Sequence, residues 1–308
     1  MNRLVVVLGL LAACGRIDFD ALRGDGASGD AGTCLGTGTF TNVQPISAIN
    51  TAAIQYGTFI SPDGLTLLWD QSDGTYERLY VTQRAARTDA FPSGGLIPGN
   101  FPAAEQYDPS ITADQLELYF DSEITGKLCL YRATRASTAV PFDPPVMLPT
   151  LCATDPIAGA AISADGLTLA YNTSLDAATE GDLYVTARAD RSAEFPAGKK
   201  LNGLPTGIGF PALSADRLRL WFEEEIPGNG FKLVSAERIS PSDDFSQLHD
   251  VTEIDTNGSE GDVSTLTNPI GLQRSGIRYH RAPPNLGADN REVRAWLQAD
   301  SADPLGPN

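Results

Sequence analysis

The stretch Ser61-Pro62-Asp63-Gly64 is the first of four related tetrapeptides in this chain. The other three begin at residues 112, 163 and 214, each 51 residues after the one before, and they read Thr112-Ala113-Asp114-Gln115, Ser163-Ala164-Asp165-Gly166 and Ser214-Ala215-Asp216-Arg217. A strand-rich repeat with a period of about 40 to 50 residues is typical of β-propellers, in which each repeat forms one blade. The spacing therefore predicts an all-β propeller.

The sequence around each tetrapeptide predicts a four-stranded antiparallel blade. A short apolar segment, such as 158–162, precedes the tetrapeptide, and the Asp and Gly of the tetrapeptide suit a tight hairpin turn. Two further β-rich segments follow, and a Phe recurs near the start of the expected fourth strand. The second strands are expected at 65–69, 116–120, 167–171 and 218–222, the third at 79–82, 130–133, 183–186 and 233–236, and the recurring residues are Phe91, Phe142, Phe195 and Phe245.

The two ends of the chain are expected to form one blade together. A degenerate unit begins near 260–264, continues through 277–281 and 292–298, and has no fourth strand of its own. Phe40 lies 51 residues before the first recurring Phe, so we expect a strand starting at Phe40 to pair near Val293. The sequence thus predicts a five-bladed propeller over residues 34–299, closed by the N-terminal strand, with a disordered tail at 300–308.

The N-terminus has the pattern of a bacterial export signal. Arg3 supplies a positive charge, an apolar run covers 4–11, and Leu11-Ala12-Ala13-Cys14 follows. The run is too short to span a bilayer. Small residues before a cysteine resemble a lipobox, which implies a signal peptide over 1–14, cleavage before Cys14 and lipid attachment at Cys14. If Cys14 is lipidated, two or more acyl chains would anchor the protein stably. The alternative is an ordinary secretory signal that happens to contain this cysteine.

Residues 15–33 are expected to form a flexible tether, because they are small, acidic and glycine-rich. The whole chain has 39 Asp and Glu against 22 Lys and Arg, a formal net charge of −17. This charge disfavours a nucleic-acid partner, which needs clustered Lys and Arg, and it disfavours adhesion to anionic lipid by charge alone. Membrane contact is therefore expected through the lipid anchor only.

The tetrapeptide, the aromatic-acid second strand and the Leu-Tyr-x-x-x-Arg third strand resemble the WD40-like repeats of TolB-type propellers and of bacterial envelope lipoproteins. The resemblance covers about residues 40 to 298 and implies a propeller in the cell envelope, facing the periplasm or the cell surface. Gly15 stands where lipoproteins of the enteric type carry an inner-membrane retention aspartate, so the resemblance favours the outer membrane. TolB itself has an extra N-terminal domain and a sixth blade, and because the sequence shows a pattern for neither, we do not expect a role in the Tol system.

Polar residues that recur in four repeats are interpreted as structural. An arginine follows each third strand, at Arg84, Arg135, Arg188 and Arg238, and an acid or amide follows each second-strand aromatic, at Asp70, Asp121, Asn172 and Glu223. We expect the two sets to meet as ion pairs or hydrogen bonds within each blade. A functional site should instead break the repeat.

The starts of the inner strands line the axial channel, and there the repeats differ. One offers Glu105, Tyr107 and Asp108, and the degenerate repeat offers Glu260 and Asp262. Carboxylates on separate blades resemble the arrangement in five-bladed arabinanase-type glycosidases, where acid and base stand about 5 or 9 Å apart. This makes Glu105, Asp108, Glu260 and Asp262 candidate catalytic residues, and solvated residues of the channel mouth are the alternative.

Signals for other chemistry are scarce. His249 and His280 have no metal-ligand spacing, and no nucleophile elbow, P-loop or C-x-x-C motif occurs, so we expect neither a metal nor another cofactor. Cys129 and Cys152 are candidates for a disulfide, with Cys34 left over. The sequence therefore favours a lipid-anchored envelope propeller that binds a protein or a glycan, and a glycan-active hydrolase that uses the channel carboxylates is the alternative.

Overall fold

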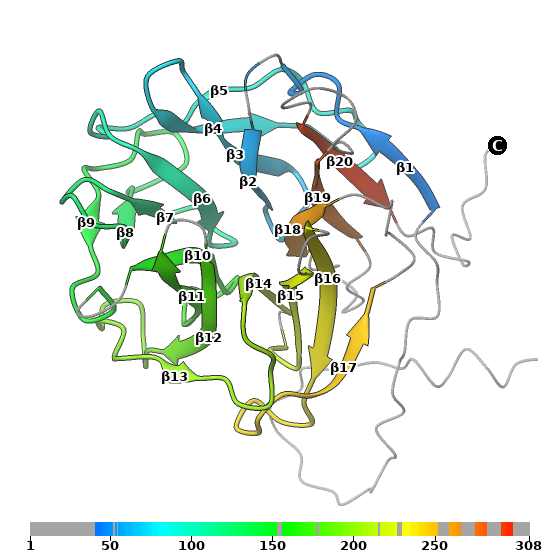
Figure 1. Ribbon diagram of the computed structural model, residues 1–308. Coiled ribbons are helices and arrows are strands. Elements are labelled where there is room, and N and C mark those ends of the chain that lie inside the picture. The colour runs from blue at the N-terminus through cyan, green and yellow to red at the C-terminus, as the bar shows by residue number, and fades with distance from the viewer. Residues whose placement is uncertain are drawn as a thin grey trace, which may run out of the picture. The chain divides into compact units, whose positions relative to one another are not determined.

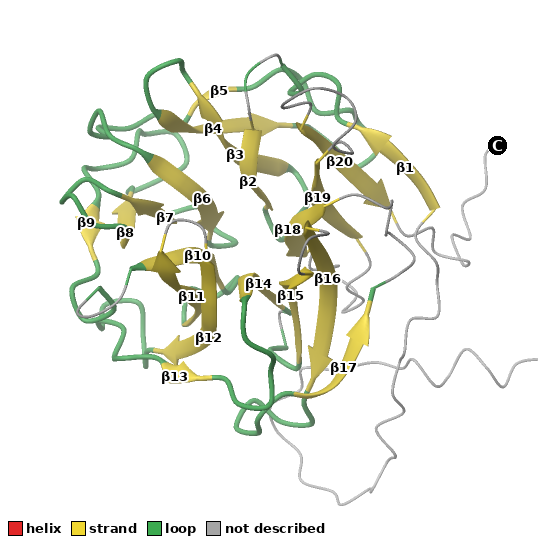
Figure 2. Ribbon diagram, viewed as in Figure 1, coloured by secondary structure: helices red, strands yellow, loops and turns green. Residues whose placement is uncertain are grey.

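The computed structural model describes the backbone of residues 41–51, 53, 55–152, 156–176, 179–214, 216–226, 230–251, 259–265, 275–281 and 291–297. These residues form strands, turns and loops, and no helix occurs among them (Figure 2). The expected signal peptide with Cys14, the tether over 15–33, Cys34, Phe40 and the tail over 300–308 all lie outside this part of the chain.

Four blades follow one another along the chain, and each is a four-stranded antiparallel sheet. The prediction of an all-β propeller with four-stranded antiparallel blades is confirmed. The strands are β2 (Gln55–Ile60), β3 (Thr66–Ser72), β4 (Glu77–Gln83) and β5 (Gly95–Leu96); β6 (Gln106–Ile111), β7 (Glu117–Ser122), β8 (Cys129–Thr134) and β9 (Val146–Met147); β10 (Ile157–Ile162), β11 (Thr168–Asp176), β12 (Thr179–Ala187) and β13 (Lys199–Lys200); and β14 (Ile208–Leu213), β15 (Arg219–Ile226), β16 (Gly230–Glu237) and β17 (Ser246–Asp250).

A further sheet takes its strands from both ends of the sequence, in the order β1 (Thr41–Pro45), β20 (Arg291–Leu297), β19 (Ser275–Arg281) and β18 (Ser259–Thr265). In this sheet β1 pairs with β20 in antiparallel register, with Gln44 opposite Ala295 and Pro45 opposite Arg294. The expected pairing of the N-terminal strand with the strand near Val293 is thus present.

The first strand of each blade faces the middle of the molecule (Figure 1). β2 contacts β6, β6 contacts β10 and β10 contacts β14, while β18 contacts both β14 and β2. The fourth strands lie at the outside, and three of them are only two residues long. These inner strands therefore border a common axis, as propeller geometry requires.

The apolar core lies between consecutive blades. Leu118 and Phe120 of β7 pack with Leu68 of the blade before, whereas Tyr119 packs with Leu169 of the blade after. This division follows from the period-2 alternation of a strand, which sends successive side chains to opposite faces. Each blade is thus apolar on both faces, and the blades stabilise one another by stacking.

Each tetrapeptide closes the turn between the first two strands of its blade. In the first, Ser61 Oγ donates to Asp63 Oδ1 (2.5 Å), and Asp63 Oδ1 also accepts from the backbone N–H of Leu65 (2.9 Å). The same pair of bonds recurs from Thr112, Ser163 and Ser214. The hydroxyl and the carboxylate therefore occur together because their hydrogen bonds replace backbone partners inside the turn.

Cys129 on β8 and Cys152 after β9 form a disulfide, with their Cα atoms 5.4 Å apart. Both residues are buried in the core between the first two blades. The candidate disulfide that the sequence left open is thus present in the structure. Among the described residues no helix is long and apolar enough to cross a membrane.

Candidate functional site

The inner strands share a β-bulge at one repeat position, occupied by Gly57, Asp108, Gly159 and Phe210. The pairing register shifts across this position in β2, β6, β10 and β14. All four residues have positive φ angles, of 54°, 50°, 62° and 50°. A left-handed residue is expected in such a bulge, and glycine adopts it without strain. Two blades therefore keep glycine, while two hold a larger side chain in the same conformation.

The second-strand acids and amide bind this bulge in the next blade. The backbone N–H of Asp108 donates to Asp70 Oδ1 (3.0 Å), that of Gly159 to Asp121 Oδ2 (2.6 Å), and that of Phe210 to Asn172 Oδ1 (3.2 Å). The acceptor side chains are 0% to 2% exposed. Each of these three bonds, which we call clasps, joins one blade to the next. They form because a buried backbone N–H needs a hydrogen-bond partner.

The recurring arginines have other partners, so the expectation that they meet these acids as ion pairs or hydrogen bonds within each blade was wrong. The Nε groups of Arg84, Arg135, Arg188 and Arg238 donate to backbone carbonyls of the turn after the first strand, over 2.7 to 2.8 Å. Each guanidinium also lies over the recurring Phe, at 4.3 to 4.6 Å from the ring centroid. That Phe therefore anchors a loop before the fourth strand, rather than starting the strand.

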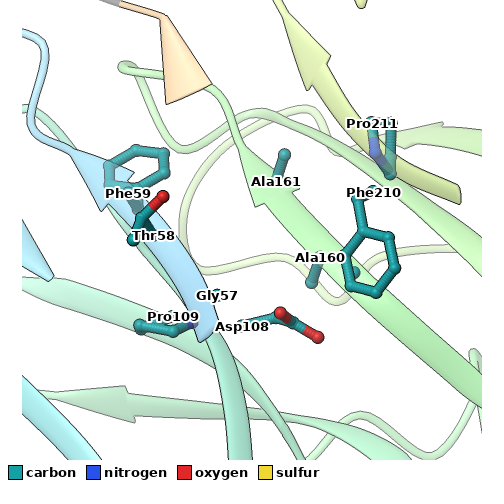
Figure 3. Close-up of a pocket in the computed structure, with 10 residues that line it drawn as sticks. Gly57, Thr58, Phe59, Asp108, Pro109, Ala160, Ala161, Phe210 and Pro211 are labelled. Carbon is teal, nitrogen blue, oxygen red and sulfur yellow. The ribbon is translucent and has the colours of Figure 1, made fainter. Parts of the chain in front are cut away.

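A pocket opens at the bulges, on the axial side of the inner strands (Figure 3). Its walls are mainly small or apolar and come from four inner strands; they are Gly57, Thr58, Phe59, Asp108, Pro109, Gly159, Ala160, Ala161, Phe210 and Pro211. Figure 3 shows the Asp108 carboxylate extending toward the side where Ala160 and Phe210 lie. Asp108 is thus the one predicted site residue whose described side chain lines this pocket.

Asp108 and Phe210 hold backbone conformations that their residue types disfavour. A left-handed φ is uncommon outside glycine, and for a bulky residue it is an outlier. Such residues cost on the order of 1 to 3 kcal/mol each and concentrate at functional sites. In this ring the repeats offer glycine as an unstrained solution at the same position. The two departures from glycine both place a side chain in the pocket wall, which identifies the pocket as the candidate site.

The floor beside the pocket carries a buried carboxyl, Asp121. Burial is the largest cause that raises its pKa well above the ordinary value of 3.8, and the negative charge of Asp108 adds to the effect. The N–H of Gly159 opposes the rise, while a hydrogen bond with the Asp108 side chain and the charge of Asp70 contribute to it. Asp121 is 0% exposed, so it cannot touch a ligand in the pocket. Its raised pKa thus reflects burial first, with the nearby carboxyl groups of Asp108 and Asp70 adding to it.

Thr58 adds a second polar group to the pocket wall. Its side chain lines the pocket and is only 5% exposed. Within the described part of the chain its Oγ1 has no hydrogen-bond partner. A buried hydroxyl without a partner is unfavourable unless something else satisfies it. The Thr58 hydroxyl is therefore buried in the wall, and in Figure 3 it lies apart from the Asp108 carboxylate, which extends toward Ala160 and Phe210.

Glu105 serves a different purpose from the one expected. Its Oε2 accepts from the backbone N–H of Glu77 in the first blade (2.7 Å), and it does not line the pocket. Burial, followed by the charge of Glu105, raises the pKa of Glu77 to about 7. Burial and the same charge raise the pKa of Tyr107. Glu105 and Tyr107 thus belong to an acidic contact between the first two blades.

Two of the predicted carboxylates belong to β18. Glu260 lies opposite His280, and Asp262 falls where the register shifts between Gly261 and Val263. Their backbone is part of the sheet, and their side chains lie outside the described residues. His249 lies on β17, where its side chain is exposed. No group of three or more His, Cys, Asp or Glu is placed to hold a metal in the part of the chain that the structure describes.

A buried ion-pair network between the second and third blades was missed. Arg188 Nη2 donates to Glu117 Oε2 (2.6 Å), and Arg191 Nε donates to Glu117 Oε1 (2.8 Å). Tyr119 OH also donates to Glu117 Oε2 (2.6 Å). The signal was present, because Thr66 and Thr168 occupy the positions 51 residues before and after Glu117. Glu117 is thus an acid at a position where the repeats on either side have threonine, and it breaks the repeat.

The described site supplies one ligand-facing carboxylate. Asp108 lines the pocket, whereas Asp70 and Asp121 clasp backbone N–H groups and Glu105 caps a neighbouring strand. Two-carboxylate glycoside hydrolysis needs a second acid that touches the substrate. The described residues can therefore bind a ligand at Asp108, and they do not by themselves complete a hydrolytic pair.

Comparisons with known proteins bear on the fold. The sequence matches no protein-family profile and no curated protein. Among solved structures, a thermostable family-43 glycoside hydrolase superimposes with a TM-score of 0.54 at 11% identity, covering 84% of this chain and 98% of its own. An α-L-arabinofuranosidase from Podospora anserina in complex with cellotriose gives 0.52 at 10%, covering 85% and 97%.

TolB from Acinetobacter baumannii gives a TM-score of 0.45 at 12% identity, and the match covers 80% of this chain. It spans 55% of the length of that TolB. The neighbours therefore include both TolB-type propellers and glycoside hydrolases. The two hydrolases, at 10% and 11% identity, show a shared fold alone.

Proposed function

We propose that this protein is a binding propeller of the bacterial cell envelope, anchored through lipid on Cys14 and engaging a partner at its axial pocket. The observation that carries this proposal is what each of the described acids contacts. Asp70 and Asp121 bind backbone N–H groups of the next blade, and Asp108 alone among the described acids lines the pocket. One ligand-facing carboxylate in an apolar pocket suits recognition, since a few placed polar groups fix the orientation of a bound group.

The ring is proposed to close as five blades, with the sheet of β1, β20, β19 and β18 as the fifth. The contacts of β18 with both β14 and β2 support this closure. A disulfide tests it, because Gln44 and Ala295 are paired across β1 and β20. The double variant Gln44→Cys/Ala295→Cys is expected to form the crosslink under mild oxidation, which peptide mapping detects. Absence of the crosslink in folded protein would contradict the five-bladed closure.

The anchor is proposed from the pattern that ends at Cys14, and the outer membrane is the proposed destination. Full-length protein is expected in the membrane fraction with a lipid-modified N-terminus. The variant Cys14→Ser is expected to lose the modification and to leave that fraction. Equal fractionation of the two proteins would rule out lipid attachment at this residue.

In-cell crosslinking tests the binding role directly. The full-length protein is crosslinked in intact cells, captured through an affinity tag and analysed by mass spectrometry beside Cys14→Ser. We expect a specific envelope protein that is captured by the anchored form and lost from Cys14→Ser. Background proteins alone, in equal amounts for both forms, would oppose an envelope binding role.

A glycan-active hydrolase is the second candidate function. The observation in its favour is the position of Glu260 and Asp262 on β18, the strand that contacts β2 and β14 beside the pocket. A carboxylate from this strand would supply the second acid that Asp108 lacks among the described residues. Purified protein that cleaves a polysaccharide, and loses this activity in both Asp108→Asn and Asp262→Asn, would replace the binding proposal with hydrolysis.

A further inference from the structure

Three carboxyl groups meet beside the axial pocket. Asp70 Oδ1 accepts the backbone N–H of Asp108 (3.0 Å), and the Asp108 side chain shares a hydrogen bond with Asp121. Oxygens of Asp70 and Asp108 also crowd Gly57, where a Cβ would lie 2.0 Å from Asp70 Oδ1 and 2.8 Å from Asp108 Oδ1. The three acids thus form a short row that runs from the first blade into the second.

The fold does not require these three groups to be carboxyls. At the position equivalent to Asp70 and Asp121, Asn172 accepts the backbone N–H of Phe210, so an amide makes the same clasp. At the position of Asp108, two other blades have glycine and no side chain. The row of carboxyls is therefore a departure from the repeat that the backbone does not explain.

The pair of Asp108 and Asp121 needs one proton. An ionised carboxylate only accepts hydrogen bonds, so two carboxyl groups bond to each other only when one of them is protonated. Asp121 Oδ2 accepts the N–H of Gly159 (2.6 Å), whereas Asp121 Oδ1 has no N–H or hydroxyl donor among the described residues. A buried oxygen without a donor is unfavourable. A proton held between the two carboxyl groups removes this cost.

The strands packed against β6 and β7 supply little positive charge to this pair. Their other ionisable residues are Tyr56 of β2, Asp70 of β3, Glu77, Arg78 and Tyr80 of β4, Tyr107 of β6, Glu117 and Tyr119 of β7, and Tyr131 and Arg132 of β8, while β10 has none. Arg78 pairs with Asp73 (3.8 Å), and Arg132 lies opposite Tyr119. The charges that act on Asp121 are negative, from Asp108 and Asp70. Two full charges on the pair are therefore unfavourable.

We propose that Asp108 and Asp121 share one proton, and that this proton decides whether the Asp108 carboxylate is available to a partner in the axial pocket. With the proton in place, the pair carries one negative charge and Asp108 is tied to Asp121. When the proton leaves for the solvent, the pair carries two charges and repels itself. Asp121 is held by Gly159, so Asp108 turns further into the pocket. The control of a partner rests on the proposed binding function, whereas the shared proton does not.

A divalent cation is the other species that a row of carboxyls attracts. In the part of the chain that the structure describes, no group of three or more His, Cys, Asp or Glu is placed to hold a metal. The hydrogen bond between Asp108 and Asp121 also turns these two groups toward each other, and not toward a common ion. Saturable binding of calcium that removes the shared titration would therefore contradict the proposal.

The first test measures the proton directly. Folded protein that carries ¹³C at the side-chain carboxyl of every aspartate is titrated with acid and base, and the titration is followed by NMR. Asp108 and Asp121 are expected to share an upper titration step, since coupled carboxyls titrate as a pair, well above the ordinary value of 3.8. The amide proton of Gly159, which donates to Asp121, should follow the same step.

Two variants separate the pair from general effects. Asp108→Asn should move the titration of Asp121 down by about one pH unit or more, because it removes a negative charge and supplies an amide donor. Asparagine also tolerates a left-handed φ, so this variant keeps the bulge. Asp143→Asn removes an exposed acid of the same blade and should leave the shared step unchanged. Separate titrations of Asp108 and Asp121, ionisation of both near pH 3.8, or an Asp121 titration that Asp108→Asn does not move would each overturn the proposal.

The second test examines the control of the pocket. The partner that in-cell capture identifies is titrated calorimetrically against purified protein, at a pH below and a pH above the shared step. The affinity of the wild type is expected to differ about tenfold between the two, since a neutral and a charge-assisted hydrogen bond differ by about that much. Asp108→Asn should bind equally at both.

The two parts of the inference fail in distinguishable ways. Equal affinity of the wild type at both pH values, with the shared step present, would refute the control of the pocket and leave the binding function standing. Capture of no partner would refute the binding function, and with it the control of a partner. The NMR titration decides the shared proton in either case.

Discussion

The contact between Glu117 and Arg188 is expected to be a principal stabilising link between the second and third blades. The side chain of Arg188 is 0% exposed and that of Glu117 is 9% exposed, so neither charge is screened by water. Replacing Glu117 with Ala leaves Arg188 buried without its carboxylate. Breaking a buried pair in this way typically costs about 3 to 5 kcal/mol in the free energy of unfolding.

For Glu117→Ala we expect a loss in the free energy of unfolding near the lower end of that range. Arg188 keeps bonds from Nε to the Gly166 carbonyl (2.8 Å) and from Nη1 to the Arg191 carbonyl (3.0 Å), and it stays over the Phe195 ring. These partners offset part of the loss. We therefore expect a loss of about 3 kcal/mol, which corresponds to a fall in Tm of about 6 to 12 °C for a domain of this size.

Urea unfolding followed by tryptophan fluorescence measures this loss at pH 7. The variant Glu123→Ala, which removes an exposed acid of the same blade, should change stability by less than about 0.5 kcal/mol. A double-mutant cycle of Glu117→Ala with Arg188→Met should give a coupling of about 1 to 3 kcal/mol. A loss below about 1 kcal/mol for Glu117→Ala, or no coupling, would refute the buried link.

The same pair predicts a dependence on pH. Burial works against the charge of Glu117, but bonds from Tyr119, Arg191 and Arg188 outweigh it and hold the pKa below its ordinary value of 4.5. Because the folded-state pKa is depressed, the stabilisation is present above pH 4.5 and is lost as the pH falls through the folded-state pKa. The stability difference between the wild type and Glu117→Ala should therefore shrink on acidification below pH 4.5. A constant difference would contradict this assignment.

Three further substitutions test the clasps and the bulges. Asp121→Asn should be as stable as the wild type below pH 3.8 and more stable than the wild type as the pH rises. The reason is that the raised pKa of Asp121 makes its ionisation unfavourable in the folded state, and Asn172 shows that an amide can accept the same backbone hydrogen bond. Urea unfolding over a series of pH values checks this. Gly159→Ala should lower the free energy of unfolding by about 3 kcal/mol, because φ is +62° and a Cβ would overlap Asn172 Oδ1. Gly74→Ala, where φ is +92° and the space around the residue is open, should lower it by about 1 kcal/mol. Equal losses in the two variants would exclude the overlap. Asp108→Gly should stabilise the protein by about 1 kcal/mol in thermal unfolding, because glycine adopts the left-handed conformation of this bulge without strain.

Much of the blade could be predicted from the sequence, because its determinants are local. The tetrapeptide at Ser61 fixes a turn through bonds to residues within five positions, and the strands around it follow from period-2 patterns. The disulfide of Cys129 and Cys152 was also within reach, since both lie in one repeat.

Contacts between blades were harder to predict, because they join residues that are far apart in the sequence. Asp70 was expected to meet an arginine of its own blade, and it binds the backbone of Asp108 in the next one. Glu117 meets Arg191 across 74 positions. A repeat shows which positions are equivalent, but it does not show whether a recurring side chain faces its own blade or the neighbour. That choice depends on how the blades stack.

The pocket illustrates how a repeat separates structure from function. At the bulge position Gly57 and Gly159 meet the backbone requirement at no strain, so the sequence shows what the fold needs there. Asp108 and Phe210 meet the same requirement at a cost, and both side chains line the pocket. The fold does not need these two side chains, since glycine serves in the other two blades. Their presence is therefore best explained by what they contact in the pocket, which is why Asp108→Gly should raise stability and remove binding together.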